Sequence, residues 1–156
     1  GALMFVLDEE TVPYFRNQFD EQRVIKRYSA VVLGETLEQW VARSDLRKSE
    51  DEPFREAETH FTRKRTSTLG DETFSVLTAE PKTGRFHQIR KHLAGNGTPI
   101  VGDYLYGETA QMERLAERIG QPRMMLHAGT LGFTHPFSRN WIMVESPLPD
   151  RFAPFE

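Results

Sequence analysis

Residues 82–92, with the sequence KTGRFHQIRKH, hold four Lys or Arg and two His side chains within eleven residues of a chain whose formal net charge is −3. A hydrophobic core gains nothing from such a cluster, so these side chains must face water or an anionic partner. An arginine guanidinium binds a carboxylate or a phosphate through two parallel hydrogen bonds. The cluster therefore indicates either an anion-binding surface or an exposed face with ordinary surface ion pairs.

The same residues predict a helix from Arg85 to Ala94 with a narrow apolar stripe. On a helical wheel, two arginines lie roughly 65–75° from the centre of this stripe. An arginine placed there lays its aliphatic stem against the core and presents its guanidinium at the edge of the buried surface. The stripe consists of Phe86, Ile89 and Leu93, the flanking arginines are Arg85 and Arg90, and His87 and Lys91 lie opposite.

The histidines lack the spacing of a metal site. His87 and His92 are five positions apart, whereas two ligands on one helical face are four apart, and the chain contains no cysteine. A phosphate-binding P-loop is excluded as well, because no glycine in residues 95–107, GNGTPIVGDYLYG, is followed by Lys-Ser or Lys-Thr. These glycines are interpreted as turns around a buried strand, TPIVG, and no metal is expected.

Length and composition indicate one globular domain over residues 1–156, since 38% of the residues are hydrophobic. The absence of cysteine is compatible with a reducing compartment such as the cytoplasm, and no apolar run is long enough to span a membrane. Acidic residues gather in 7–10 and 48–58, whereas basic residues gather in 62–67 and 82–92. The acidic total argues against a nucleic-acid partner, but this separation of charge favours one.

Helix and strand patterns are mixed without a regular βαβ alternation, which predicts an α+β fold with a mixed, mainly antiparallel sheet flanked by helices. Residues 57–67 and 73–81 are predicted to form a hairpin around LGDE. Residues 44–56 are predicted to be the most mobile loop. The other predicted elements are helices over 11–19 and 112–119, a strand over 26–34, and short strands within 123–136 and 140–147.

Three segments resemble, in the same order, segments of the RluA-type family of pseudouridine synthases. Residues 83–107, TGRFHQIRKHLAGNGTPIVGDYLYG, resemble the family pattern TGR-x-HQIR-x-HLA…G-x-PI-x-GD-x-x-YG. Residues 18–34 resemble the segment that ends in K-x-Y-x-A-x-V-x-G, and residues 123–152 resemble the closing segment R-L-x-LHA-x-x-L-x-F-x-HP. The form EPKTGR-x-HQ-[IL]-R-[RK]-HLA is most similar to the bacterial branch that modifies transfer RNA.

This resemblance implies an isomerase that converts uridine in RNA to pseudouridine without a cofactor. The base leaves the stack, and an aspartate attacks the sugar or assists cleavage of the glycosidic bond. The resemblance places the arginine that pairs with this aspartate at Arg90, and the tyrosine that stacks on the base at Tyr28. Met125 and Leu126 are expected to form the apolar floor under the uracil, or else to pack in the core. The residues expected to contact RNA or the substrate are Arg63, Lys64, Arg65, Arg85, His87, Gln88 and Lys91.

The aspartate itself has no match in residues 1–156, because the family places it in an H-R-L-D-x-x-[TS]-S-G segment. Residues 5–11, FVLDEET, are similar only superficially, since Asp8 precedes Tyr28 by 20 residues where the family has about 32. In the alignment, Gly1 takes the place of the closing glycine of the motif, and the nucleophile falls about five residues upstream. We therefore expect residues 1–156 to be the carboxyl-terminal two-thirds of a catalytic domain, inactive without a missing amino-terminal segment.

Three origins of this absence stay open: a truncated chain, a cleaved product, or a non-catalytic relative. Two functions follow, a pseudouridine synthase acting on tRNA or rRNA, or an RNA-binding or assembly module without chemistry. Tyr28 and Arg90 favour the enzyme, because a pure binding module does not need a partner for a catalytic carboxylate. The site prediction requires Arg90 to point into a cleft beside Tyr28.

Overall fold

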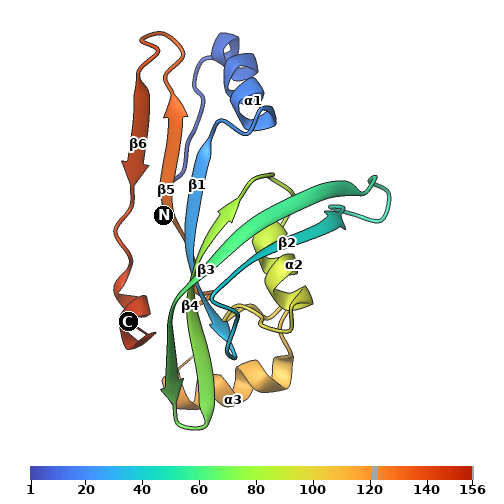
Figure 1. Cartoon of the computed structure of the whole chain (residues 1–156), viewed down its shortest axis with the longest axis vertical. Helices are drawn as coiled ribbons and strands as arrows, with labels where there is room; N and C mark the ends of the chain where they lie inside the picture. Colours follow the sequence, from blue (N-terminus) through green and yellow to red (C-terminus); the bar gives the residue numbers. More distant parts are fainter. Residues whose placement is uncertain (121–122, 156) are drawn as a thin grey trace.

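The computed structural model describes residues 1–120 and 123–155, which form one six-stranded sheet with three α-helices and two short 3₁₀ helices, η1 (Glu9–Thr11) and η2 (Asp150–Phe155) (Figure 1). Strand order is β2-β3-β4-β1-β5-β6, and every neighbouring pair is antiparallel. The predicted α+β class with a mainly antiparallel sheet is confirmed. The strands are β1 (Ile25–Leu33), β2 (Gln39–Leu46), β3 (Arg55–Leu69), β4 (Glu72–Pro81), β5 (Leu126–Thr134) and β6 (Trp141–Glu145).

Strand β1 lies near the middle of the sheet, between β4 and β5. Its second half, Ala30–Leu33, is buried on both faces, as a continuous apolar run requires. Its first half is only partly buried, and this is the part of the sheet that borders the site described below. The predicted β3–β4 hairpin is confirmed, with Gly70 at φ +62° in the turn.

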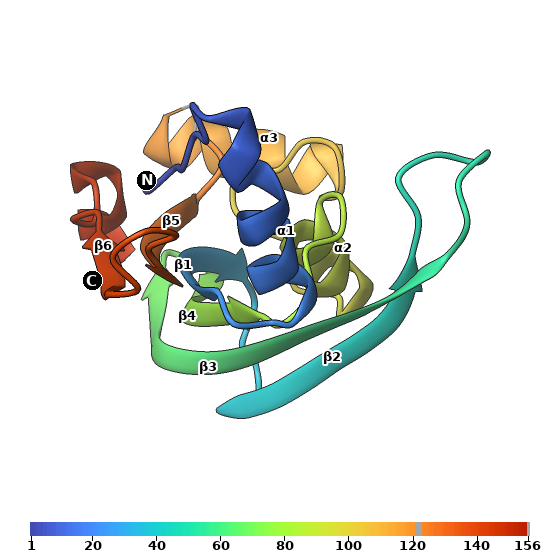
Figure 2. The ribbon, with the colours of Figure 1, turned by 90° about the horizontal axis from the view of Figure 1, so that it is seen from above.

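The three α-helices lie on the same side of the sheet (Figure 2). They are α1 (Val12–Asp20), α2 (Gln88–Gly95) and α3 (Thr109–Ile119). Pro13 lies in the first turn of α1, where its missing N–H has no partner to lose. Gly97 and Gly120 follow α2 and α3 with φ of +76° and +75°, so both helices end at residues that adopt left-handed backbone freely.

The core lies on both faces of the sheet. Ile89 and Leu93 of α2 are buried with Phe61 and Leu77 of the sheet in one cluster. At the carboxyl end of the chain, η2 contributes Phe155, whose ring packs edge-on against Phe74 with centroids 5.1 Å apart. No helix in the described part of the chain is long and apolar enough to cross a membrane.

Helix α2 begins three residues later than the sequence predicts. His87 has φ +52° and ψ +29°, a left-handed conformation that an α-helix cannot contain, so the helix starts at Gln88. Arg85 and Phe86 therefore precede the helix. Phe86 is 44% exposed and stacks on His87 instead of extending the apolar stripe, which makes its predicted place in the core wrong.

The predicted mobile loop over 44–56 is wrong at both ends. Strand β2 continues to Leu46 and β3 begins at Arg55, so only residues 47–54 connect two strands. Strand β2 is an edge strand, and only its alternate side chains, such as Trp40 and Ala42, are partly buried. Because charged residues occupy much of the other face, the strand pattern is weak in the sequence. The predicted strand TPIVG is only a single bridge between Ile100 and Val32.

Candidate active site

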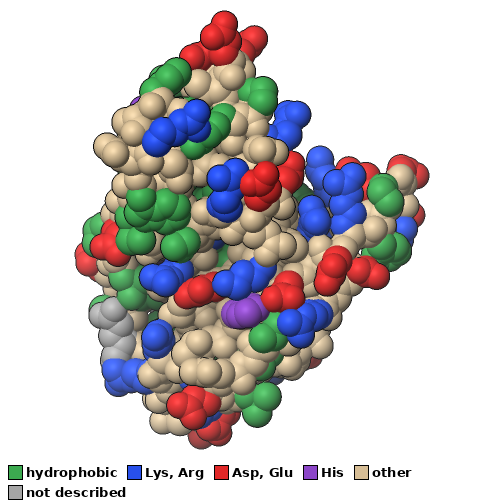
Figure 3. All heavy atoms as spheres, turned by 45° about the horizontal axis from the view of Figure 1, so that its top comes forward, with side chains coloured by type: hydrophobic (Ala, Val, Ile, Leu, Met, Phe, Trp, Pro, Cys, Tyr) green, Lys and Arg blue, Asp and Glu red, His purple; other side chains and the backbone are tan. Residues whose placement is uncertain are grey.

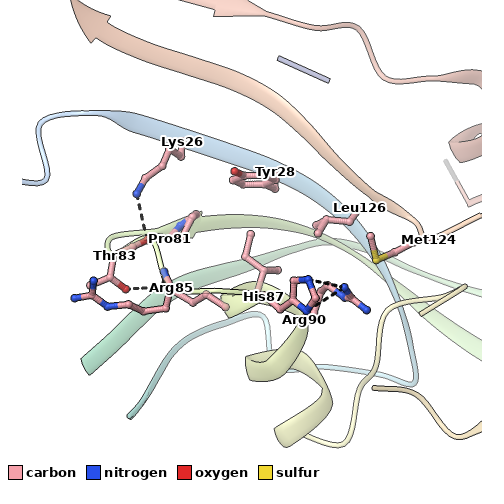
Figure 4. A pocket seen from close by; sticks show the side chains of 12 residues that line it. Lys26, Tyr28, Pro81, Thr83, Arg85, His87, Arg90, Met124 and Leu126 are labelled. Carbon is pink, nitrogen blue, oxygen red and sulfur yellow. Dashed lines mark hydrogen bonds between the residues drawn. The ribbon is translucent and has the colours of Figure 1, made fainter. Parts of the chain in front are cut away.

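A cavity of about 330 Å³ opens between β1, the start of β5 and the segment that joins β4 to α2 (Figure 4). Tyr28 and Arg90, far apart in the sequence, both border it, as the predicted cleft requires. None of the described residues that border the cavity is Asp or Glu. The lining residues are Lys26, Tyr28, Pro81, Thr83, Gly84, Arg85, His87, Gln88, Ile89, Arg90, Met124 and Leu126.

Tyr28 supplies a planar ring to the cavity. It lies on β1 opposite Ala79 of β4 and Ala128 of β5, and neither alanine is large enough to cover a neighbouring ring. Burial raises the pKa of the Tyr28 phenol, so the hydroxyl stays protonated at neutral pH. Such a ring offers an apolar face and one polar edge, which suits a planar heterocyclic base.

The apolar wall beside Tyr28 comes from Met124 and Leu126 (Figure 4). The prediction for Leu126 agrees with this position, whereas the prediction for Met125 needs correction. Met125 is 2% exposed and belongs to the core cluster. Side chains alternate between the two faces in extended backbone, so residues 124 and 126 share a face that residue 125 cannot.

Arg90 has a carboxylate partner within the chain. Its Nε donates to Oδ2 of Asp103, and its Nη2 donates to Oδ1, both at 2.7 Å. The two side chains are only 14% and 1% exposed. Burial alone would raise the pKa of Asp103, but the hydrogen bonds and charge of Arg90 outweigh burial and lower it, while the hydrogen bonds that Arg90 donates to Asp103 raise the pKa of Arg90. Both groups are therefore ionised at neutral pH.

This pair corrects the expectation that Arg90 lacks a carboxylate partner in residues 1–156. The pair also weakens the argument that Arg90 favours an enzyme over a binding module. Arg90 already has a carboxylate partner in Asp103, so it does not require a catalytic carboxylate. Asp103 belongs to the segment GDYLYG (102–107), whose glycines the sequence analysis interprets only as turns.

His87 lies next to Arg90 at the entrance to α2. Nη1 of Arg90 is 3.2 Å from Nε2 and 3.3 Å from Nδ1 of the imidazole, and the Tyr106 hydroxyl is 3.0 Å from Nδ1. The other face of the imidazole stacks on Phe86, with centroids 3.7 Å apart. Burial lowers the pKa of His87, and the positive charges of Arg90 and Lys91 lower it further, so the imidazole is neutral at pH 7.

We predict that His87 titrates below its ordinary pKa of about 6.5 in the intact protein. Replacing Arg90 by Gln should raise the pKa of His87, because this change removes a nearby cation and leaves the Asp103 carboxylate uncompensated. NMR titration of the His87 imidazole carbons in the wild type and in Arg90→Gln tests this. An unchanged or lower His87 pKa in the variant would contradict the described surroundings.

The side-chain amide of Gln88 makes four hydrogen bonds within the chain. Its amide nitrogen donates to the Glu58 carbonyl and to Oγ1 of Thr59, both at 2.9 Å. Its amide oxygen accepts from Oγ1 of Thr83 at 2.6 Å and from the Arg85 N–H at 2.9 Å. Because four hydrogen bonds hold the side chain between β3 and the α2 entrance, the prediction that Gln88 binds substrate directly is not favoured.

Three of the predicted RNA-contacting cations make hydrogen bonds within the chain. Nε of Arg85 donates to the Glu56 carbonyl, and Nζ of Lys91 donates to the Arg47 carbonyl, at 3.0 and 2.7 Å. Arg63 contacts Glu35 and the Thr36 carbonyl. Figure 3 shows Lys and Arg side chains in separate groups with Asp and Glu between them.

Strand β3 has an irregularity at the predicted basic run. Arg63 pairs with Leu77 of β4 and Arg65 pairs with the adjacent Val76, so Lys64 is the additional residue of a bulge. Leu77 and Val76 face opposite sides of the sheet, and their partners Arg63 and Arg65 do the same. Among the three predicted phosphate contacts here, exposed Lys64 and Arg65 stay available, whereas Arg63 is engaged by Glu35.

Lys26 is a cavity residue that the sequence analysis missed. Its Nζ donates to the Thr83 carbonyl at 3.2 Å, and its side chain extends from β1 beside Tyr28 (Figure 4). Burial lowers the pKa of Lys26, and the charges of Lys82 and Arg85 lower it further. The sequence could have indicated Lys26 as a site residue, because it is the first residue of the K-x-Y pattern that contains Tyr28.

The amino-terminal residues run beside β5 at the level of Tyr28. The Ala2 N–H donates to the Ala128 carbonyl at 2.7 Å, and Ala128 pairs with Tyr28. A Cβ at Gly1 would lie 2.9 Å from the Ala128 oxygen and 3.1 Å from its Cβ, so this close approach requires glycine. Gly1 is therefore placed one strand away from the cavity.

Comparisons with known proteins agree with this geometry. A family model described as RNA pseudouridylate synthase matches residues 1–95. A tRNA pseudouridine synthase C from Haemophilus ducreyi is 31% identical over 168 residues, which cover 97% of this chain and 69% of that protein. A ribosomal large subunit pseudouridine synthase D from Nitrosomonas europaea is 35% identical over 151 residues, which cover 87% of this chain and 43% of that protein.

The fold has similar solved structures. The human RNA pseudouridylate synthase domain containing 1 superposes with a TM-score of 0.72 at 26% identity, and the match covers 90% of this chain and 61% of that one. This chain thus spans between 43% and 69% of the length of these three relatives. It belongs to the RNA pseudouridylate synthase family, as the RluA-type resemblance of its sequence predicts.

Proposed function

We propose that residues 1–156 form the base-binding part of an enzyme that isomerises uridine to pseudouridine in RNA. The observation that carries this proposal is the shared cavity of Tyr28 and Arg90, with the apolar wall of Met124 and Leu126 between them. Membership of the family supports the reaction class. The named bacterial relatives modify tRNA and the large ribosomal subunit, and on this ground we propose a cytoplasmic location.

In the proposed reaction, a uridine leaves its stack and its uracil lies against the Tyr28 ring. Extrusion costs a few kcal/mol, which stacking and apolar contact offset. A carboxylate then attacks C1′ of the ribose or assists cleavage of the C1′–N1 bond, whose electron pair goes to the uracil. The ring turns and C5 bonds to C1′, which releases the carboxylate if it had attacked that carbon. C5 then loses its proton, and N1 gains one. The atoms of the product are those of the substrate, so no cofactor is consumed.

The chain contributes charge and shape to these steps. Arg90 places a fixed positive charge at the cavity, where it would keep an attacking carboxylate ionised and stabilise charge that develops on the uracil. The protonated Tyr28 hydroxyl and the neutral His87 imidazole are available for proton exchange with the base. The apolar wall excludes water, which strengthens each of these interactions.

We propose that the attacking carboxylate comes from outside residues 1–156. No carboxylate borders the described cavity, and Asp103 is held by Arg90. Asp8 is exposed and caps η1 through the Glu10 N–H. The position of Gly1 beside Ala128 supports this proposal, because a segment joined there would start next to the cavity. The family segment H-R-L-D-x-x-[TS]-S-G is the proposed donor, and residues 1–156 alone are proposed to be inactive.

The cavity without a carboxylate also supports a second candidate, an RNA-binding or assembly module without chemistry. The two candidates differ in one outcome. Residues 1–156 joined to the family segment should modify RNA if the cavity is catalytic, whereas a binding module should bind RNA equally well and modify none.

The experiment uses unmodified tRNA and rRNA transcripts incubated with this joined protein. Pseudouridines are located by carbodiimide modification and primer-extension stops. The proposed function predicts stops at one or a few positions in structured RNA. The named relatives act on tRNA and on the large ribosomal subunit, so the same experiment identifies which RNA is the target. The absence of new stops in every transcript, with RNA binding intact, would instead support the binding module.

RNA binding should depend on salt through Arg85 and Lys91. Each phosphate contact that is lost should make the slope of log affinity against log salt shallower by about 0.7–0.9. We therefore expect shallower slopes for Arg85→Ala and Lys91→Ala, measured by fluorescence anisotropy from low to physiological salt. Arg118→Ala, which removes an α3 charge paired with Asp71, is the control and should leave the slope unchanged. Equal slopes in all proteins would show that Arg85 and Lys91 touch no phosphate.

A further inference from the structure

Asp103 binds one edge of the Arg90 guanidinium, and the remaining nitrogen, Nη1, contacts only His87 among the described residues. The carboxylate accepts from Nε and Nη2, both at 2.7 Å. Nη1, on the remaining edge, is directed to the His87 side, and both His87 and Arg90 border the cavity. A guanidinium is planar, so fixing two of its nitrogens also fixes the third.

Asp103 is itself held rigidly. Its Oδ1 accepts from the Leu105 and Tyr106 N–H groups at 3.2 and 3.3 Å, and its carbonyl accepts from the Gly107 N–H at 2.9 Å. A Cβ at Gly107 would lie 2.8 Å from that carbonyl oxygen, so only glycine permits this turn. The carboxylate therefore has little freedom to follow Arg90 if the arginine moves.

Tyr106, from the same turn as Asp103, contacts both Arg90 and His87. Its ring centroid lies 4.8 Å from Cζ of Arg90, and its hydroxyl contacts His87. Arg90 thus has a carboxylate at one edge and an aromatic ring over its plane, both supplied by residues 103–106. Both contacts favour a charged guanidinium in a single orientation.

We propose that Asp103 is a positioning residue for the isomerisation: it orients Arg90 so that Nη1 faces the cavity, where it meets the attacking carboxylate. This inference rests on the proposed function. It assigns to the GDYLYG segment a task beyond turning the chain, because Asp103 acts on the reaction only through Arg90.

The first test uses residues 1–156 alone and needs no activity. Hydrogen exchange of the Arg90 Nε–H is followed by NMR in the wild type, Asp103→Asn and Asp71→Asn. Asp71 is an exposed acid that pairs with Arg118, so Asp71→Asn is a matched change of charge far from the cavity. We expect slow exchange in the wild type and Asp71→Asn, and fast exchange in Asp103→Asn. Equal exchange in all three proteins would overturn the inference.

The second test measures single-turnover rates and RNA affinity in residues 1–156 joined to the aspartate segment. Asp103→Asn should lower the rate about 10²-fold with RNA affinity unchanged, because charge stabilisation is lost but the RNA surface is not. In an Arg90→Gln background the same change should lower the rate no further. A wild-type rate in Asp103→Asn, or independent losses that multiply in the double variant, would contradict action through Arg90.

Asp103→Glu covers the case in which Asp103→Asn does not fold. It keeps the charge but displaces the guanidinium by about one bond length, for which we expect a rate about 10–100-fold lower per folded molecule. A merely structural role predicts a lower melting temperature with an unchanged rate per folded molecule. If the joined wild-type protein shows no turnover, the proposed function fails, whereas the exchange experiment still decides whether Asp103 orients Arg90.

Discussion

Arg90→Gln should lower the free energy of unfolding of residues 1–156 by about 3–5 kcal/mol. The reason is the carboxylate that it leaves behind, since Asp103 is 1% exposed and loses both side-chain hydrogen bonds. Glutamine is too short to replace the bidentate hydrogen bonds of the guanidinium, and the burial of Asp103 limits its contact with water. Urea denaturation at pH 7 measures the difference.

The loss of unfolding free energy in Arg90→Gln should depend on pH if it arises from the buried charge of Asp103, and should not if it arises from lost packing. The folded pKa of Asp103 lies below its unfolded value in the wild type, so the pair stabilises the fold above about pH 4 and this stabilisation is lost as the pH falls through the folded pKa. Without Arg90, burial instead raises the pKa of Asp103, and protonation relieves the buried charge. The deficit of Arg90→Gln should therefore shrink as the pH falls from 7 towards 4.

Arg27→Gln is the matched control for this experiment. Arg27 pairs with Glu80 at 2.9 Å, but the two side chains are 48% and 37% exposed. Solvent screens such pairs, so we expect a cost of at most about 1 kcal/mol with no comparable pH dependence between 4 and 7. Equal costs for Arg27→Gln and Arg90→Gln would show that the Arg90–Asp103 pair is not buried as described.

The RluA-type resemblance assigns Tyr28 and Arg90 to the candidate site, and both border the cavity. K-x-Y places Tyr28 on a strand, and HQIR places Arg90 in a helix, whatever surrounds them. Asp103 could not be assigned to Arg90 in this way, because their contact depends on how the turn after α2 folds back. The left-handed backbone of His87 could not be predicted either, because residues other than glycine adopt it rarely and the surrounding structure imposes it here.

The remaining differences have the same origin in tertiary structure. Met125 and Met124 are chemically identical, and only the alternation of side chains in the extended backbone that leads into β5 decides which one reaches the cavity. Strand β2 has a weak pattern because the face that carries Trp40 also carries Ala42 and Ser44, which are small or polar. By contrast, β1, β3 and β4 have long apolar or alternating runs, and their predicted positions are confirmed.

Replacing the aspartate of the joined segment by asparagine should abolish turnover, with a loss of about 10⁴-fold or more. An asparagine amide neither attacks C1′ nor stabilises positive charge that develops on the ribose. RNA affinity should stay nearly unchanged, since the phosphate contacts proposed for Arg85 and Lys91 lie within residues 1–156. A loss of RNA binding equal to the loss of turnover would contradict this division of roles.

Tritium release from RNA labelled at C5 of uridine tests the central proposal most directly, because the C5 proton is lost only when the isomerisation proceeds. Three proteins are compared: residues 1–156 alone, the same residues joined to the H-R-L-D segment, and the joined protein with asparagine in place of its aspartate. We predict release above background only from the second protein. Robust release from residues 1–156 alone would contradict the proposal that the carboxylate comes from outside these residues, and would direct attention back to Asp8.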